Sequence, residues 1–222
     1  MQEALIFFIK YPEAGRVKTR LGRDIGNENA ALLYRSFVED MLDSFDRSGL
    51  NTLIFYDSYQ PIEKYTEWLG KRYFHQQEGN DLGTKMHIAF EECFSCGFER
   101  CLLTGSDLPG LPPETIATAF AALKNSPACI GPADDGGYYL IGFQKDGFTK
   151  SIFTDMIWST KTVYNETVTR LNSAALAPAI LPFFSDVDTL PDLKKILNIP
   201  GAKKTCPRTC LTAERILIKY PG

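Results

Sequence analysis

The sequence predicts an α/β fold in which helices cover both faces of a mixed, mostly parallel β-sheet. Apolar runs of strand length alternate with amphipathic segments of helix length along most of the chain. Several of these runs are followed by loops rich in glycine and charged residues, as expected where parallel strands end at a ligand site. The chain has 222 residues, of which 44% are hydrophobic and 23% charged, an ordinary globular composition. One domain is therefore expected.

Each predicted strand is a short run of apolar, aromatic or β-branched residues bounded by polar, glycine or proline residues. The first run leads directly into a polar loop at residues 10–26. Helix-length segments separate most of the strands, which favours parallel pairing. The expected strands are residues 4–9, 52–56, 73–75, 100–103, 128–130, 138–143 and 180–181.

The predicted helices carry apolar residues at a spacing close to 3.6 and are bounded by residues typical of helix ends. Asn27 can cap the longest helix, and Gly49 ends it. Pro61 fits the first turn of the next helix. The expected helices are residues 27–48, 61–69, 81–96 (starting at Asp81 or Thr84), 113–123, 160–171, a short one from Pro191 and a terminal one from about Thr212.

Charge and hydropathy exclude two classes of protein. The net charge is −3 and the pI about 5.5, whereas dedicated nucleic-acid binders usually carry a basic balance. No apolar run approaches the roughly 20 residues that a membrane span requires, and the first residues do not resemble a signal peptide. We therefore expect a cytoplasmic protein without nucleic-acid or membrane partners. Its oligomeric state cannot be predicted.

The six cysteines suit a reducing compartment, where they act as small apolar residues. Cys93 and Cys96 form a CxxC pair, so a zinc or redox site is an alternative. The spacing signature is incomplete, and helical periodicity explains Cys93 equally well. We expect reduced thiols without a metal.

The loop after the first strand contains the densest group of cations in the sequence. Between Lys10 and Gly22 it holds Lys10, Arg16, Lys18 and Arg20, together with glycines and a hydroxyl. Backbone N–H groups near glycine and charge-assisted bonds from Lys and Arg suit phosphate groups. A solvated basic loop is the alternative. The composition and the place after a strand favour phosphate binding.

Three further loops contain acidic residues where strands end. Asp107 follows the strand at 100–103 and could hold Mg²⁺, or could merely shape a turn. The run from Asp134 to Tyr138 permits close approach to a ligand, but it also reads as a hairpin turn. Asp186 and Asp188 share one face if the segment is extended, so both could reach one cation. The alternative is that Asp188 or Thr189 caps the following helix.

Six motifs, in order, resemble a bacterial glycosyltransferase-like family, also called nucleotide-diphospho-sugar transferases of the radical-SAM/selenodomain-associated type. The resemblance covers roughly residues 4–195 and extends, more distantly, to MobA-like nucleotidyltransferases and 2-phospholactate guanylyltransferase. It leaves residues 200–222 as a C-terminal extension of one domain spanning 1–222. The motifs are FIKYPEAGRVKTRL (8–21), GNDLGTKM (79–86), GSDLP (105–109), GPADDGGYYLIG (131–142), WST (158–160) and DVDT (186–189).

The resemblance implies the Rossmann-like GT-A fold, a nucleotide or nucleotide-sugar substrate, a small-molecule acceptor and bound Mg²⁺ or Mn²⁺. It implies catalytic roles for Lys18 and Asp107. The implied nucleotide-binding residues are Arg16, Lys18, Thr19, Arg20, Gly79, Asp81 and Gly83. The implied acceptor-binding residues are Asp134, Asp135, Gly136, Gly137, Tyr138 and Trp158. The implied metal ligands are Asp107, Asp188 and Asp186.

The resulting hypothesis is a metal-dependent transferase that uses a nucleoside triphosphate or a nucleotide-sugar. Glycosyltransferases of this fold usually carry a DxD motif, whereas here a single acid, Asp107, follows Gly105 and Ser106. This difference favours nucleotidyl transfer onto a small acceptor over sugar transfer from a nucleotide-sugar donor. A non-catalytic nucleotide-binding protein is a more remote alternative. The base and the acceptor cannot be read from the sequence.

Overall fold

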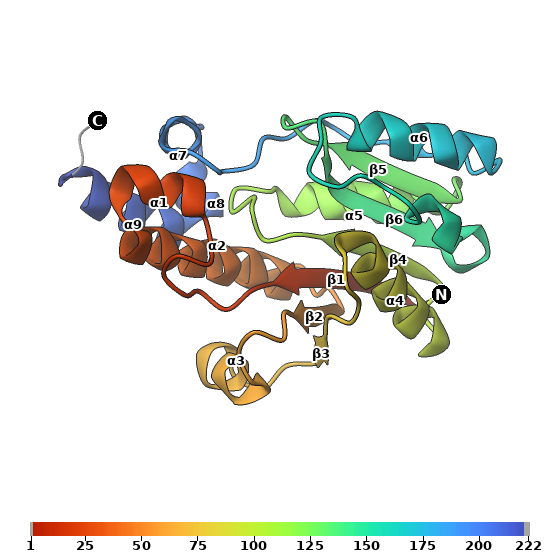
Figure 1. The fold of residues 1–222 in the computed structure, drawn as a ribbon, viewed down its shortest axis with the longest axis horizontal. Helices are drawn as coiled ribbons and strands as arrows, with labels where there is room; N and C mark the ends of the chain where they lie inside the picture. The colour runs from red at the N-terminus through yellow and green to blue at the C-terminus, as the bar shows by residue number, and fades with distance from the viewer. Residues whose placement is uncertain (1, 220–222) are drawn as a thin grey trace.

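The computed structural model describes residues 2–219, and within them seven strands form one sheet in the order β3-β2-β1-β4-β6-β5-β7 (Figure 1). Six of the strands run parallel, and only β6 is antiparallel to its neighbours β4 and β5. The predicted mixed, mostly parallel sheet is therefore confirmed. The strands are β1 (Glu3–Ile9), β2 (Thr52–Tyr56), β3 (Phe74–Gln76), β4 (Arg100–Thr104), β5 (Ala128–Pro132), β6 (Tyr138–Gln144) and β7 (Ala179–Ile180).

Helices cover both faces of the sheet because alternate strand residues point to opposite sides. In β1, Leu5 and Phe7 pack into a core with α1, α2, α5 and α7 to α9, whereas Ile6 and Phe8 pack toward α4 and α6. Two short 3₁₀ turns follow β6 at Lys145–Gly147 and Lys150–Ile152. The helices are α1 (Thr19–Ile25), α2 (Asn27–Arg47), α3 (Ile62–Leu69), α4 (Leu82–Ser95), α5 (Pro113–Ala122), α6 (Val163–Ser173), α7 (Leu190–Leu197), α8 (Ala202–Thr205) and α9 (Pro207–Leu217).

The strand order reverses at β1, which pairs with β2 on one side and with β4 on the other. At such a switch point the loops after two neighbouring strands diverge and leave a crevice at their carboxyl ends. Here these are the loop after β1, which carries Lys18, and the loop after β4, which carries Asp107. The fold thus places the two segments side by side, as the sequence predicted.

Two segments differ from the sequence-based expectation. Part of the expected polar loop at 10–26 forms α1, because Leu21 and Ile25 lie one turn apart and are fully buried. Asn27 is the first residue of α2 rather than its cap, and Gly26, with φ of +85°, occupies the cap position. A left-handed backbone of this kind favours glycine.

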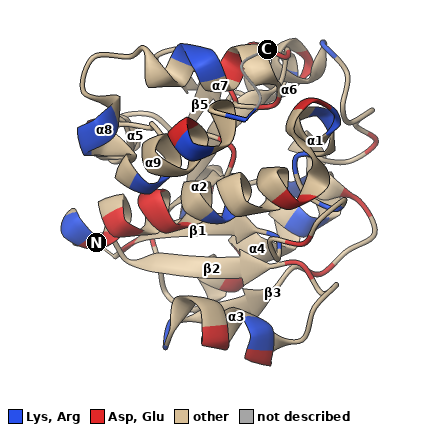
Figure 2. Ribbon diagram, turned by 90° about the vertical axis from the view of Figure 1, so that its left-hand side faces the viewer, with Lys and Arg blue, Asp and Glu red and all other residues tan. Residues whose placement is uncertain are grey.

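The C-terminal extension packs against α2. Its last helix, α9, begins at Pro207, earlier than the expected Thr212. The carboxylate of Asp40 in α2 is buried and accepts hydrogen bonds from the backbone N–H groups of Arg208 (3.1 Å) and Thr209 (2.8 Å). Figure 2 shows the basic residues of α8 and α9 in blue and the acidic residues of α2 in red. Arg208 meets Asp43 of α2 in an ion pair, so charge pairing adds to this contact.

Candidate active site

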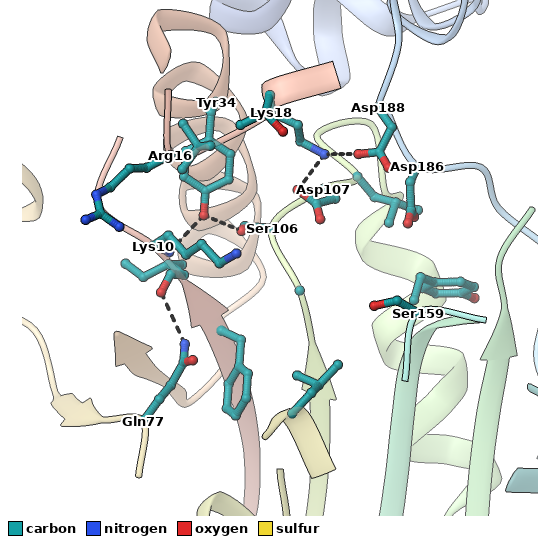
Figure 3. A pocket seen from close by; sticks show the side chains of 18 of the residues that line it. Lys10, Arg16, Lys18, Tyr34, Gln77, Ser106, Asp107, Ser159, Asp186 and Asp188 are labelled. Atoms are coloured by element: carbon teal, nitrogen blue, oxygen red, sulfur yellow. Dashed lines mark hydrogen bonds and ion pairs between the residues drawn. The ribbon is translucent and has the colours of Figure 1, made fainter. Parts of the chain in front are cut away.

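A cavity of about 660 Å³ opens at the carboxyl ends of β1 and β4 (Figure 3). Its basic lining residues come from the loop after β1 and the first turn of α1, and its acidic ones from the loop after β4 and from the segment before α7. Tyr138 and Ser159 line the wall next to β6. The basic residues that line it are Lys10, Arg16, Lys18 and Arg20, and the acidic residues are Asp107, Asp186 and Asp188.

Lys18 joins the two walls of this cavity. Its ammonium nitrogen lies 2.6 Å from Asp107 Oδ1 and 2.8 Å from Asp188 Oδ1, and its side chain is only 3% exposed. Burial opposes the charge, but attraction to Asp107 and Asp188 outweighs it, so the pKa of Lys18 is raised. Lys18 also has φ of +47°, a left-handed conformation that is uncommon outside glycine. The buried ammonium group therefore stands between the two carboxylates.

A backbone hydrogen bond explains why acids so distant in sequence meet. The N–H of Val187 donates to the carbonyl oxygen of Asp107 at 3.0 Å. This bond fixes the segment that carries Asp186 and Asp188 beside the loop after β4. Thr189 then caps α7 through a reciprocal pair of bonds with Asp192, the capping role that we expected of Asp188 or Thr189.

Asp186 lies near Asp107 and Asp188, and one of its carboxylate oxygens has no hydrogen-bond partner among the described residues. This oxygen, Oδ1, is buried. Burial and, secondly, repulsion by Asp107 raise the pKa of Asp186 to about 7. A buried carboxylate oxygen without a donor suits a cation. Residues 2–219 contain no group of three or more His, Cys, Asp or Glu side chains that could together hold a metal ion as they are placed. A bound Mg²⁺ or Mn²⁺ would therefore need further ligands from water or phosphates.

The other cations of the first loop are more exposed than Lys18. Arg20 lies 3.5 Å from Asp188 through Nη1, and its side chain is 69% exposed. The guanidinium of Arg16 lies over the ring of Tyr59, 3.0 Å from the ring centroid. Thr19 begins α1 and also lines the cavity. Arg16 and Arg20 can therefore reach a bound anion without breaking a buried contact.

The segment predicted to border the base lies largely outside the cavity. Asp81 caps α4, accepting from the backbone N–H of Thr84 at 3.0 Å and from its hydroxyl at 2.6 Å. These bonds lower the pKa of Asp81. A Cβ on Gly83 would lie 2.6 Å from the Trp158 ring, so Gly83 permits this close contact. Asp81, Gly83 and Trp158 line a separate pocket of about 320 Å³, while Gly79 lines neither.

Of the residues predicted to bind the acceptor, only Tyr138 lines the main cavity. Asp135 accepts from the backbone N–H of Gly137 at 2.8 Å, as in a turn, and Asp134 contacts Ser185. A Cβ on Gly136 would lie 2.3 Å from the carbonyl oxygen of Lys161, so only glycine fits there. The acidic run thus adopts the turn that the sequence offered as the alternative to a binding loop.

Sequence reasoning missed several polar lining residues, among them Tyr34 and Gln77. Tyr34, which lies among the buried apolar residues of α2, places its hydroxyl 2.7 Å from Ser106 Oγ. Gln77 donates through Nε2 to the carbonyl oxygens of Ile9 (3.2 Å) and Phe55 (2.8 Å). Two carbonyl acceptors fix the amide orientation, because only the NH₂ group can donate to both. A hydroxyl-bearing side chain within an otherwise apolar helix face is the one sequence signal that could have pointed to Tyr34.

Residues 41–160 match the family described as "Uncharacterized protein conserved in bacteria (DUF2064)". The chain belongs to this family. The chain is also similar to a solved protein from Desulfovibrio desulfuricans G20, provisionally described as a nucleotide-diphospho-sugar transferase. The two share 39% identity over 99% of each chain, with a TM-score of 0.89. No curated protein matches the chain.

More distant solved structures share the fold of the DUF2064-family chain. CMP:2-keto-3-deoxy-manno-octonic acid synthetase in complex with CTP is 11% identical, over 88% of this chain and 97% of that one, with a TM-score of 0.55. Rv0371c from Mycobacterium tuberculosis H37Rv in complex with manganese is 15% identical, over 88% and 97%, with a TM-score of 0.51. The fold is thus that of nucleotide-diphospho-sugar transferases. In residues 2–219 no helix has the length and apolar character needed to cross a membrane.

Proposed function

We propose that this protein is a divalent-cation-dependent transferase that takes a nucleoside triphosphate and transfers its nucleotidyl group to a small acceptor. The observation that carries the proposal is the cluster of Lys18, Asp107 and Asp188 in the cavity at the switch point of the sheet. In open α/β sheets this crevice is the usual place of ligand binding. The similarity to a protein described as a nucleotide-diphospho-sugar transferase supports a nucleotide-containing substrate.

The phosphates would bind along the basic wall of the cavity. Arg16 and Arg20 are exposed and can turn toward a bound triphosphate, and Lys18 can move from the carboxylates to the phosphates when a metal ion replaces its charge. Charge-assisted hydrogen bonds of this type are each worth about 1.5–3 kcal/mol. We place Thr19 in the same subsite.

Asp107, Asp186 and Asp188 would hold the cation, Mg²⁺ or Mn²⁺, once Lys18 leaves the space between Asp107 and Asp188. The unpartnered oxygen of Asp186 and the proximity of Asp107 to Asp188 fit such an ion. The related Rv0371c has been solved with manganese, which supports a divalent ion in this fold. When bound, the ion would neutralise negative charge on the phosphates. The chain's own residues would orient the triphosphate and the acceptor, with Lys18 stabilising charge that develops at the transferred phosphoryl group.

Nucleotidyl transfer is favoured over sugar transfer because the loop after β4 provides one acid, Asp107, rather than two. The solved structures that share the fold include a synthetase in complex with CTP, which is consistent with the use of a triphosphate. We place the acceptor against Tyr138. The turn at Asp134, Asp135, Gly136 and Gly137, together with Trp158, would form the wall behind the acceptor. We place the base toward Gly79, Asp81 and Gly83. Sugar transfer from a nucleotide-sugar is the second candidate, favoured by the description of the 39% identical relative.

Two measurements test the proposal. A thermal-shift series with the common nucleoside triphosphates and nucleotide-sugars, with and without Mg²⁺, should show Mg²⁺-dependent stabilisation by a triphosphate. Incubation of that nucleotide with candidate acceptors should then release pyrophosphate. Release of a nucleoside diphosphate from a nucleotide-sugar would support sugar transfer instead. Absence of stabilisation by every nucleotide would contradict both candidates.

A further inference from the structure

The backbone pairing between β1 and β4 stops just before the active site. The last pair in their register is Phe7 with Thr104, and beyond it Phe8 and Ile9 pair only with β2. The loops that carry Lys18 and Asp107 therefore leave the sheet with no ladder bonds between β1 and β4 to fix their separation. Both loops must nevertheless be held accurately, since small displacements of reacting groups have large effects on binding and rate.

One side-chain oxygen spans this gap. The hydroxyl of Tyr34, in α2, accepts a hydrogen bond from the backbone N–H of Lys10 at 2.9 Å and lies 2.7 Å from Ser106 Oγ (Figure 3). Lys10 is the first residue after β1, and Ser106 immediately precedes Asp107. Since the phenol oxygen already accepts from Lys10, its own hydrogen is available for Ser106. Tyr34 thus bridges the starts of both loops.

These contacts form a closed circuit around the cavity. The chain runs from Lys10 to Lys18, whose ammonium group pairs with Asp107. Asp107 is bonded covalently to Ser106, and Ser106 returns through Tyr34 to Lys10. A closed circuit restricts the separation of its members more strongly than a single contact does.

Tyr34 is buried, so its hydroxyl contacts Lys10 and Ser106 rather than solvent. Tyr34 is 3% exposed and Ser106 6% exposed. Burial, together with the negative charge of Asp107, raises the pKa of Tyr34, so the phenol keeps its proton. A phenylalanine would fill the same space in the core without bridging the loops. The hydroxyl is therefore separable from the packing of the ring.

We propose that Tyr34 is a positioning residue that sets the distance between the phosphate-binding loop and the loop carrying Asp107. This inference rests on the proposed function. The bridge couples two events: phosphates held by the first loop and a cation held by the second. Without the hydroxyl, each loop can still bind its own partner, but binding of one no longer favours binding of the other to the same degree.

The test compares Tyr34→Phe with the wild-type protein, using inorganic tripolyphosphate and Mn²⁺ as probes. Calorimetric titration of tripolyphosphate with and without Mn²⁺ gives the factor by which the metal strengthens phosphate binding. We expect Tyr34→Phe to reduce this factor about tenfold, the effect of losing one well-placed hydrogen bond. Ser106→Ala should act similarly, and the double variant should be little weaker than either single variant, because both remove the same bridge.

Tyr65→Phe is the matched control. Tyr65 is also fully buried, and its hydroxyl bonds to Asp57, but it does not line the cavity. Its variant should lower the melting temperature while leaving the metal-dependent factor within about twofold of wild type. An unchanged factor in Tyr34→Phe and Ser106→Ala, or an equal loss in Tyr65→Phe, would overturn the positioning role. Failure of the wild-type protein to bind tripolyphosphate with Mn²⁺ would overturn the proposed function as well, so the two failures are distinguishable.

Discussion

Lys18 and Asp107 come from different loops of the protein, yet the ammonium nitrogen of one lies 2.6 Å from a carboxylate oxygen of the other. The ammonium group of Lys18 occupies the position between Asp107 and Asp188 at which the sequence suggested a shared metal ion. In the protein alone, a lysine therefore supplies the positive charge that the acids require. Binding of a divalent ion there requires the lysine to leave, and a triphosphate offers it an alternative partner.

Replacing Lys18 with methionine tests this exchange. Methionine keeps most of the side-chain volume but leaves Asp107 and Asp188 without their shared cation. We expect a loss of about 1–3 kcal/mol in the free energy of unfolding when EDTA is present. Mn²⁺ alone should restore stability in this variant more than in the wild-type protein, because the ion no longer competes with the ammonium group. Affinity for a nucleoside triphosphate should fall by about tenfold to a hundredfold. Chemical denaturation and nucleotide titration measure these effects.

Asp107→Asn separates the charge of the carboxylate from its shape. The asparagine keeps the size and turn-forming capacity of the side chain, so unfolding free energy should change by less than about 1 kcal/mol at this half-exposed position. Mg²⁺ should no longer strengthen triphosphate binding. Asp188→Asn should behave similarly but more mildly if Asp186 can substitute. Asp24→Asn, an exposed acid of α1, is the control and should bind as wild type. Retention of the full Mg²⁺ effect in Asp107→Asn would exclude this residue from the metal site.

Arg20→Ala tests the exposed part of the phosphate loop. Because its side chain is 69% exposed, its removal should hardly affect stability. Triphosphate affinity should decrease by roughly three- to thirtyfold, as expected for one charge-assisted contact. Arg23→Ala removes an equally charged, exposed residue of the same helix that does not line the cavity. Equal effects of both variants would indicate general electrostatic attraction rather than a specific contact.

Most of the fold could be predicted from the sequence because apolar periodicity reflects burial. The strand at Thr52–Tyr56 and the helix after Asp81 agree with the structure, since alternation and capping are local properties. The antiparallel direction of β6 was predictable only through the hairpin-turn alternative at residues 134–138, because it depends on how that short turn joins β6 to β5. The helix α1 was missed because its charged residues concealed Leu21 and Ile25.

The candidate site was predictable only where its chemistry is local. Charged residues after strands identified Lys18 and Asp107, since such loops end in the crevice of a parallel sheet. The buried position of Lys18 between two carboxylates depends on tertiary contacts that no short motif encodes. Tyr34 was hidden by its place in an apolar stripe. Trp158 begins one of the motifs that carry the family resemblance, but it packs against Gly83 and does not line the main cavity.

Asp186 provides a prediction about pH. Its pKa in the folded protein is about 7, mainly through burial, whereas an unfolded chain has a value near 4. Between these values the folded protein retains a proton that the unfolded chain has lost, so this group makes stability fall as pH rises from about 4 to about 7. Above that window its effect is constant. The fully ionised carboxylate then costs roughly 1–4 kcal/mol.

Asp186→Asn should remove this dependence, because the amide carries no charge at any pH. The variant should match wild type near pH 4 and become increasingly more stable than wild type up to about pH 7.5, in urea unfolding with EDTA present. Adding Mn²⁺ with a triphosphate should narrow the difference at pH 8, because a cation stabilises the ionised carboxylate of the wild-type protein alone. A stability difference that is constant between pH 4 and pH 8 would show that folding does not raise the pKa of Asp186 above its unfolded value near 4. The unpartnered oxygen of Asp186 would then no longer support a cation site at this residue.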